Sequence, residues 1–250
     1  MNAPLRMEAL KLTHSLVGLI ASLATVLGTL AVLGGITLGI AGGNAQLIAK
    51  AGPAAAQNWA GLIAGAAQII AVTAILGFGI VLAWMFAREF TEGTITGLFA
   101  LPYGRDRIAM AKLIVYAAWA TLTAAALLTG VLVLGLLLGY GLPDASTWGS
   151  LARVGALALL SAAIAAPIAW IATVTRSLLA AVGATIALVV TAQVGALAGA
   201  GGWMPIAAPA LWAMSGGRDV NGPQLLLALA VGPAAALLTT ATWNRLQLDR

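Results

Sequence analysis

The stretch LIVYAAWATLTAAALLTGVLVLGLLLGY, from Leu113 to Tyr140, decides the fold class because its 28 residues include no charge. A helix needs about 20 mostly apolar residues to cross the roughly 30 Å hydrocarbon core of a bilayer. Five more charge-free stretches of at least 20 residues occur along the chain, at 16–40, 61–86, 154–175, 178–200 and 224–243. The sequence therefore predicts an all-α integral membrane protein with six transmembrane helices.

The composition agrees with this fold class. Of the 250 residues, 62% are hydrophobic and 8% are charged, and the mean hydropathy is +1.03, whereas soluble domains carry about 25% charged residues. Six spans leave only short connections, which excludes a fused ATPase or a large soluble domain. The chain has no cysteine and His14 is its only histidine, so we predict no metal site. We interpret the net charge of +5 as juxtamembrane basic residues and predict no nucleic acid partner.

The distribution of basic residues predicts the orientation, because cytoplasmic connections collect Lys and Arg. With both termini cytoplasmic, nine basic residues lie on the inner side: Arg6, Lys11, Arg88, Arg105, Arg107, Lys112, Arg176, Arg245 and Arg250. Three lie on the outer side: Lys50, Arg153 and Arg218. The stretch 16–40 is too long for the apolar core of a signal peptide, so we expect it to remain as a span. The three residues 175–177 predict a tight turn between the fourth and fifth spans.

None of the six stretches contains an ionisable residue. Proton-coupled carriers generally need a buried carboxylate or histidine, and an intramembrane hydrolase needs a base beside its nucleophile, so both classes are disfavoured. The polar residues inside the spans are expected mainly to form hydrogen bonds between and within helices. An alternative role, lining a polar pathway, applies to four of them: Gln68, Thr73, Thr191 and Gln193.

The connection between the second and third spans, residues 88–107, differs from an ordinary loop. It contains six charged residues, and its apolar residues recur at spacings of three and four: Ile95, Leu98, Phe99 and Leu101. This pattern predicts an amphipathic helix of two to three turns. Pro102 and the following Tyr103-Gly104 pair are expected to end it.

Two interpretations of this helix remain open. It could lie on the inner headgroups of the membrane, as interfacial helices do, or it could contact a cytoplasmic partner protein. The carboxylates of Glu89 and Glu92 favour a partner protein, because anionic lipids would repel them.

The same segment resembles the type 2 permeases of ATP-binding-cassette (ABC) transporters. The family pattern E-x-x-x-G-T-x-x-x-L-x-x-x-P-x-x-R-x-x-x-x-x-x-K is matched by Glu89, Gly93, Thr94, Leu98, Pro102, Arg105 and Lys112. Residues 1–15, with Glu8 and Lys11-Leu12, resemble the interfacial N-terminal helix of that family. Residues 201–222, with Trp203-Met204-Pro205 and Pro209-Ala210-Leu211-Trp212, resemble its extracellular element, which is re-entrant or a short helix. The chain is most similar to six-helix permeases found beside bacteriocin, lantibiotic and bacitracin resistance ATPases in bacteria.

The resemblance implies the type 2 exporter fold and a division of labour. The chain has no G-x-x-x-x-G-K-[ST] phosphate loop, so it is not expected to be an enzyme or to bind a cofactor. Two copies of a separate ABC ATPase would hold ATP and magnesium. Within the coupling segment 88–107, residues Glu89 to Leu101 would act as a coupling helix against that ATPase. The residues that contact it would be Glu89, Phe90, Glu92, Gly93, Thr94, Leu98, Phe99, Pro102 and Arg105. Glu89 and Glu92 would pair with basic groups of the ATPase.

The resemblance further implies a second permease copy or a sister permease in a bacterial inner membrane, with membrane lipids around both. We expect export of an amphipathic or hydrophobic substrate, such as a peptide antibiotic, a drug or a lipid-like molecule. The alternatives are a non-transporting module that recruits an ATPase, a permease for sodium or other ions, and a secondary carrier or channel.

Overall fold

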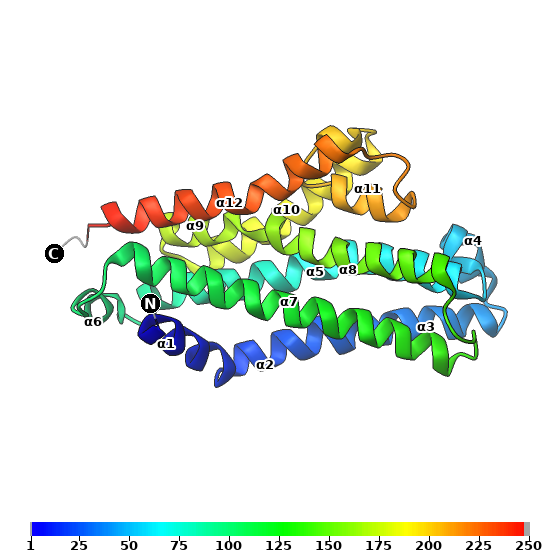
Figure 1. The fold of residues 1–250 in the computed structure, drawn as a ribbon, viewed down its shortest axis with the longest axis horizontal. Coiled ribbons are helices and arrows are strands. Elements are labelled where there is room, and N and C mark those ends of the chain that lie inside the picture. Colours follow the sequence, from blue (N-terminus) through cyan, green and yellow to red (C-terminus); the bar gives the residue numbers. More distant parts are fainter. Residues whose placement is uncertain (1, 248–250) are drawn as a thin grey trace.

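The computed structural model describes residues 2–247, and the regular structure in that part of the chain is entirely helical. Six helical segments are long and apolar enough to cross a membrane, which confirms the predicted fold class. They are α2 with α3 (Leu16–Ala41), α5 (Trp59–Thr91), α7 (Arg105–Leu137), α8 with α9 (Ala145–Thr175), α10 (Leu178–Leu197) and α12 (Gly222–Arg245). Figure 1 shows them as an elongated bundle.

Two of the spans consist of joined helices. In the first span, α2 (Leu16–Leu23) and α3 (Thr29–Ala41) are joined by one wider π-helical turn, Ala24–Gly28. In the fourth span, α8 (Ala145–Ala165) continues into α9 (Pro167–Thr175) with proline in the first turn of α9. Proline has no amide hydrogen to donate, so the change of helix at that position is expected.

The remaining helices are short and lie between or before the spans. They are α1 (Asn2–Thr13), α4 (Ala45–Ala51) with the 3-10 turn Gly52–Ala55, α6 (Ile95–Phe99), the 3-10 turn Gly201–Trp203 and α11 (Ala208–Met214). Both ends of the described chain lie with α6 at one end of the bundle, which we call the α6 end (Figure 1). The helices α4 and α11 lie away from it.

The helix α5 forms the centre of the bundle and packs against α3, α7, α8, α9 and α10. Its many Ala and Gly residues permit close approach: a Cβ atom on Gly79 would come within 2.3 Å of Cγ2 of Thr185 on α10. Larger side chains fill the space toward α7, where Phe78 meets Trp119 edge to face at a centroid distance of 5.6 Å. The core is therefore built from small residues on one side of α5 and aromatic rings on another.

The connection between α9 and α10 is as short as predicted. The helix α9 ends at Thr175, and α10 begins at Leu178. Arg176 adopts the left-handed conformation with φ of 52°, and the hydroxyl of Ser177 accepts a hydrogen bond from the amide of Ala180 at the start of α10. A left-handed residue followed by an N-cap reverses the chain within two residues.

The helices α5 and α7 extend beyond the charge-free stretches, so charged residues that flank these stretches belong to the same helices. Each has 33 residues, which gives a length of about 50 Å against a hydrocarbon core of about 30 Å. Helical structure therefore continues into the polar zone beyond the hydrocarbon core. Glu89 lies in the last turn of α5 and Lys112 in the second turn of α7, both at the α6 end.

Candidate functional site

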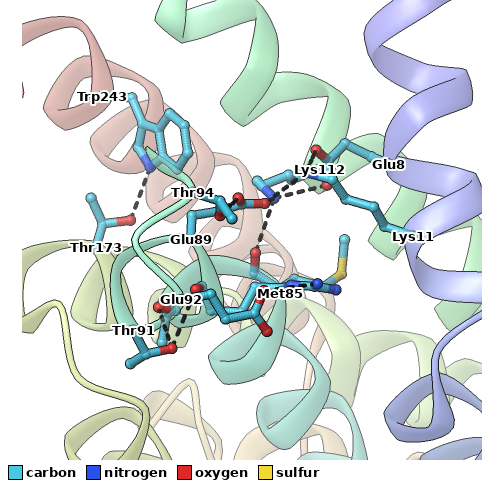
Figure 2. Close-up of polar contacts among 12 residues, drawn as sticks. Glu8, Lys11, Met85, Glu89, Thr91, Glu92, Thr94, Lys112, Thr173 and Trp243 are labelled. Atoms are coloured by element: carbon cyan, nitrogen blue, oxygen red, sulfur yellow. Dashed lines mark hydrogen bonds and ion pairs between the residues drawn. The ribbon is translucent and has the colours of Figure 1, made fainter. Parts of the chain in front are cut away.

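The α6 end contains a buried cluster of four charged residues that come from three helices (Figure 2). Glu8 and Lys11 lie on α1, Glu89 on α5 and Lys112 on α7. Glu8, Glu89 and Lys112 are at most 2% exposed, whereas the side chain of Lys11 is 27% exposed. We call these four residues the ion-pair cluster. Two carboxylates and two ammonium groups make it electrically neutral.

Lys112 is the centre of the ion-pair cluster and is fully buried. Its Nζ donates to Oε2 of Glu8 and to Oε1 of Glu89, each at 2.8 Å, and to the carbonyl of Met85 at 3.0 Å. An ammonium group has three N–H donors and no acceptor. All three donors of Lys112 are therefore satisfied inside the protein.

Glu89 links the ion-pair cluster to the segment that follows α5. Its Oε1 accepts from Lys11 and from Lys112, each at 2.8 Å. Its Oε2 accepts from the hydroxyl of Thr94 at 2.7 Å. Thr94 immediately precedes α6, so this carboxylate joins the start of α6 to α1 and α7 as well as to its own helix.

The charge on Lys11 is stabilised by the ion-pair cluster. Burial alone lowers the pKa of Lys11, but its hydrogen bond to Glu89 and its attraction to both carboxylates raise the pKa above its ordinary value. The stabilisation from Lys11 is therefore fully present below the pKa of an unfolded lysine and is lost as the pH rises through the folded value. The cluster keeps this positive charge throughout the neutral range.

The segment predicted as one amphipathic helix over Glu89–Leu101 is divided in two by a turn, so that prediction is wrong. The helix α5 continues to Thr91, Gly93 has φ of 67°, and α6 then contains only five residues. A positive φ is accessible to glycine without strain but interrupts a helix. The residues between α5 and α7 are accordingly 92–104.

One side of α6 is fixed to the ends of the spans. Ile95 and Leu98 are buried, and Phe99 meets the ring of Trp243 on α12 at a centroid distance of 6.0 Å. Trp243 is itself fully buried: its ring also meets Phe86 at 5.9 Å, and its Nε1 donates to the hydroxyl of Thr173 at 3.0 Å. The contacts of Trp243 thereby join α6 to α5, α9 and α12.

The other side of α6 is open. Thr96, Gly97 and Ala100 are exposed, as are Leu101 and Pro102 after the helix. The exposed side thus has small residues and no charge within α6 itself.

The predicted coupling residues divide between a buried and an exposed group. Exposed are Glu92, Gly93, Thr94 and Pro102; partly buried are Phe90, Phe99 and Arg105; buried are Glu89 and Leu98. The prediction that Glu89 pairs with a basic group on a partner is wrong, because both of its oxygens are satisfied within the chain.

Glu92 differs from Glu89 because it remains 48% exposed, and within residues 2–247 its one ion pair is with Arg88, at 3.0 Å. Arg105 lies over the ring of Phe99 at 4.3 Å from its centroid and donates to the carbonyl of Leu246. Arg105 therefore joins the residues that follow α6 to the end of α12.

The four candidate pathway residues do not form one group. Gln68 is exposed and lines a cavity of about 140 Å³ beside α4. Thr73 lines a cavity of about 370 Å³ between α2 and α5, and its hydroxyl accepts from Thr29 at 2.9 Å. Thr191 and Gln193 lie on α10 and line neither of these two cavities. Within residues 2–247 no group of three His, Cys, Asp or Glu residues could hold a metal ion.

The ion-pair cluster and the role of Trp243 were not predicted from the sequence. The segments that resemble the ABC permeases contain Glu8, Lys11 and Lys112. The ion pairs join residues up to 104 positions apart in the sequence, so sequence spacing did not indicate them. A tryptophan in the last turn of an apolar span was the signal available for Trp243.

The comparison with known proteins agrees with this architecture. A family described as "ABC-2 family transporter protein" matches residues 4–193 of the chain, a range that contains the ion-pair cluster, α6 and the first four spans. No curated protein matches the chain. The six apolar helices and the family match together show a multi-pass membrane protein of the kind that forms the membrane subunit of transporters. The chain belongs to the ABC-2 family of transporter proteins.

Proposed function

We propose that this chain is the permease subunit of an ATP-driven exporter and that α6 couples it to a separate ABC ATPase. The observation that carries the proposal is the construction of α6, which has one open side and one side fixed to the ends of several spans. A short helix with no structural connection to the spans would pass little movement to them. This helix has two connections.

The first connection runs through aromatic rings. Movement of Phe99 would press on Trp243, which belongs to α12 and contacts Phe86 on α5. The second runs through the hydrogen bond of Thr94 to Glu89 and from there to Lys112 on α7. Trp243 also donates to Thr173 on α9, so the two connections together reach four of the six spans. Close-packed interiors transmit displacement because they are hard to deform.

Glu92 is the carboxylate best placed to contact the ATPase. It is 48% exposed and its pair with Arg88 is on the surface, where such pairs contribute only about 0–1 kcal/mol. A basic group of a partner could therefore replace Arg88 at little cost. Both ends of the described chain would be cytoplasmic, because they lie at the same end as α6 (Figure 1).

The proposed substrate is amphipathic or hydrophobic, for example a peptide antibiotic, a drug or a lipid-like molecule. The cavity between α2 and α5 supports this class, because its lining is mostly apolar and Thr25 and Thr73 supply its side-chain hydroxyls. An ion pathway would need a lining of charges or converging carbonyls. The assembly would contain two ATPases and a second permease copy or a sister permease in a bacterial inner membrane.

A transport measurement tests this function. Inside-out vesicles containing the chain and its partner ABC ATPase should accumulate a fluorescent hydrophobic peptide when ATP is added, and a variant of the ATPase phosphate-loop lysine should abolish accumulation. The same vesicles should not accumulate radioactive sodium. Accumulation of sodium alone would favour the ion permease, and flux without the ATPase would favour a carrier or channel. ATP hydrolysis without movement of peptide or sodium would favour a module that only recruits the ATPase.

A further inference from the structure

A cavity of about 370 Å³ at the α6 end lies between α1, the start of α7 and the end of α12. It shares no residue with the ion-pair cluster or with α6. Its walls include charged and apolar residues, so it differs in character from the apolar cavity between α2 and α5.

The polarity of this cavity changes in one direction along both of its long walls. On α7 the lining begins with Asp106 and Arg107 and continues with Ile114, about 12 Å further along the helix axis. On α12, which runs in the opposite direction, it begins with Leu237 and ends with Asn244, about 10 Å apart. The polar parts of both walls therefore lie together at the α6 end, and the apolar parts lie deeper in the bundle.

This gradient matches a membrane interface. Because α7 is longer than the hydrocarbon core is thick, its first turns reach the headgroup zone. The deeper lining residues Met110, Ile114 and Leu237 are 39%, 40% and 68% exposed, as expected for side chains that contact acyl chains. A molecule that fits both parts has a polar head and an apolar tail.

The charged residues of the cavity indicate which charges the polar head of the bound molecule carries. Asp106 and Arg107 both line it, and within residues 2–247 neither side chain forms an ion pair or a side-chain hydrogen bond. A purely anionic head would be attracted by Arg107 and repelled by Asp106. A head with one phosphate and one ammonium group complements both residues.

We propose that this cavity binds phosphatidylethanolamine. Arg107 contacts the phosphate, Asp106 accepts a hydrogen bond from the primary ammonium group, and Met110, Ile114 and Leu237 contact an acyl chain. The inference requires only that the chain spans a membrane, and it stands whether or not α6 couples to an ATPase.

Lipid binding to the purified full chain tests the proposal by native mass spectrometry in detergent. Phosphatidylethanolamine should bind more tightly than phosphatidylglycerol or phosphatidylcholine with the same acyl chains. The double variant Asp106→Asn/Arg107→Gln should lower the affinity for phosphatidylethanolamine about tenfold, as expected for the loss of charge-assisted hydrogen bonds at a partly exposed site. The matched control is Arg218→Gln/Asp219→Asn, an adjacent and exposed pair outside the cavity, which should not change it.

A steric variant tests the position of the lipid independently of charge. Ala241 lines the cavity and is exposed, so Ala241→Phe should fill the space without unfolding the protein and should lower phosphatidylethanolamine binding by a similar factor. Equal binding of the three lipids to the unmodified chain would overturn the proposal. Unchanged affinity in both the charge variant and the steric variant would also overturn it.

Discussion

Replacing Lys112 by Met should lower the free energy of unfolding by about 3–5 kcal/mol, because it leaves a buried carboxylate without compensation. The side chain of Lys112 is fully buried and donates to Glu8, Glu89 and the carbonyl of Met85. Methionine has similar length and fills the same space, so the loss reports on charge rather than on a cavity. Unfolding by SDS in mixed micelles, followed by tryptophan fluorescence, measures the change.

A second variant tests whether the lost stability comes from the unbalanced charge or from the loss of the Lys112 side chain itself. In Glu8→Gln/Lys112→Met the remaining pair is Lys11 with Glu89, which are 2.8 Å apart, so the cluster is neutral again and part of the lost stability should return. The control Lys50→Met removes an exposed lysine on α4 and should change stability by less than about 0.5 kcal/mol. Wild-type stability of the Lys112 variant would contradict the structural role of the ion-pair cluster.

Replacing Trp243 by Ala should cost about 3–5 kcal/mol of stability and should also uncouple transport from ATP hydrolysis. The variant removes a fully buried ring that contacts Phe86 and Phe99, together with its hydrogen bond to Thr173. Without that ring, α6 loses its aromatic contact with α12. The measurement is the ratio of peptide transported to ATP hydrolysed in vesicles that contain the ATPase.

Two milder variants distinguish lost stability from lost coupling. Trp243→Phe keeps a ring at this position but loses the hydrogen bond to Thr173 and part of the buried ring volume, so it should cost about 1–2 kcal/mol and retain coupling. Phe99→Ala removes the partly buried ring on α6 and should lower the transport ratio with a smaller loss of stability. If Phe99→Ala transports as efficiently as the wild type, the aromatic connection has no part in coupling.

The number of spans was predictable because hydrocarbon thickness sets a minimum length of apolar sequence, and each span contains such a stretch. The ends of the spans were not predictable in the same way. A charge in the sequence looks like the end of a span, but Glu89 and Lys112 pair with each other and with α1, so their helices continue past them. That pairing depends on which helix ends meet in space.

The segment after α5 was partly predictable. The spacing of Ile95 and Leu98 identified the side of α6 that is buried, whereas the conformation of Gly93 decided where the helix divides. The pathway residues were not predictable from polarity alone. The hydroxyl of Thr73 donates a hydrogen bond to the carbonyl of Ile69 within its own helix. The other three candidates, Gln68, Thr191 and Gln193, lie on helix faces whose surroundings depend on how α5 and α10 pack.

Cross-linking at α6 tests the central claim most directly. The chain has no cysteine, so Thr96→Cys places a single thiol on the exposed side of α6, and Ser146→Cys places a control thiol at the other end of the bundle, in the first turn of α8. A thiol-directed photo-cross-linker in native membranes, followed by mass spectrometry, identifies the neighbour of each. We expect Thr96→Cys, and not Ser146→Cys, to capture a protein with a G-x-x-x-x-G-K-[ST] phosphate loop. Capture of no such protein at Thr96, or equal capture at both positions, would contradict the claim that α6 couples this permease to an ATPase.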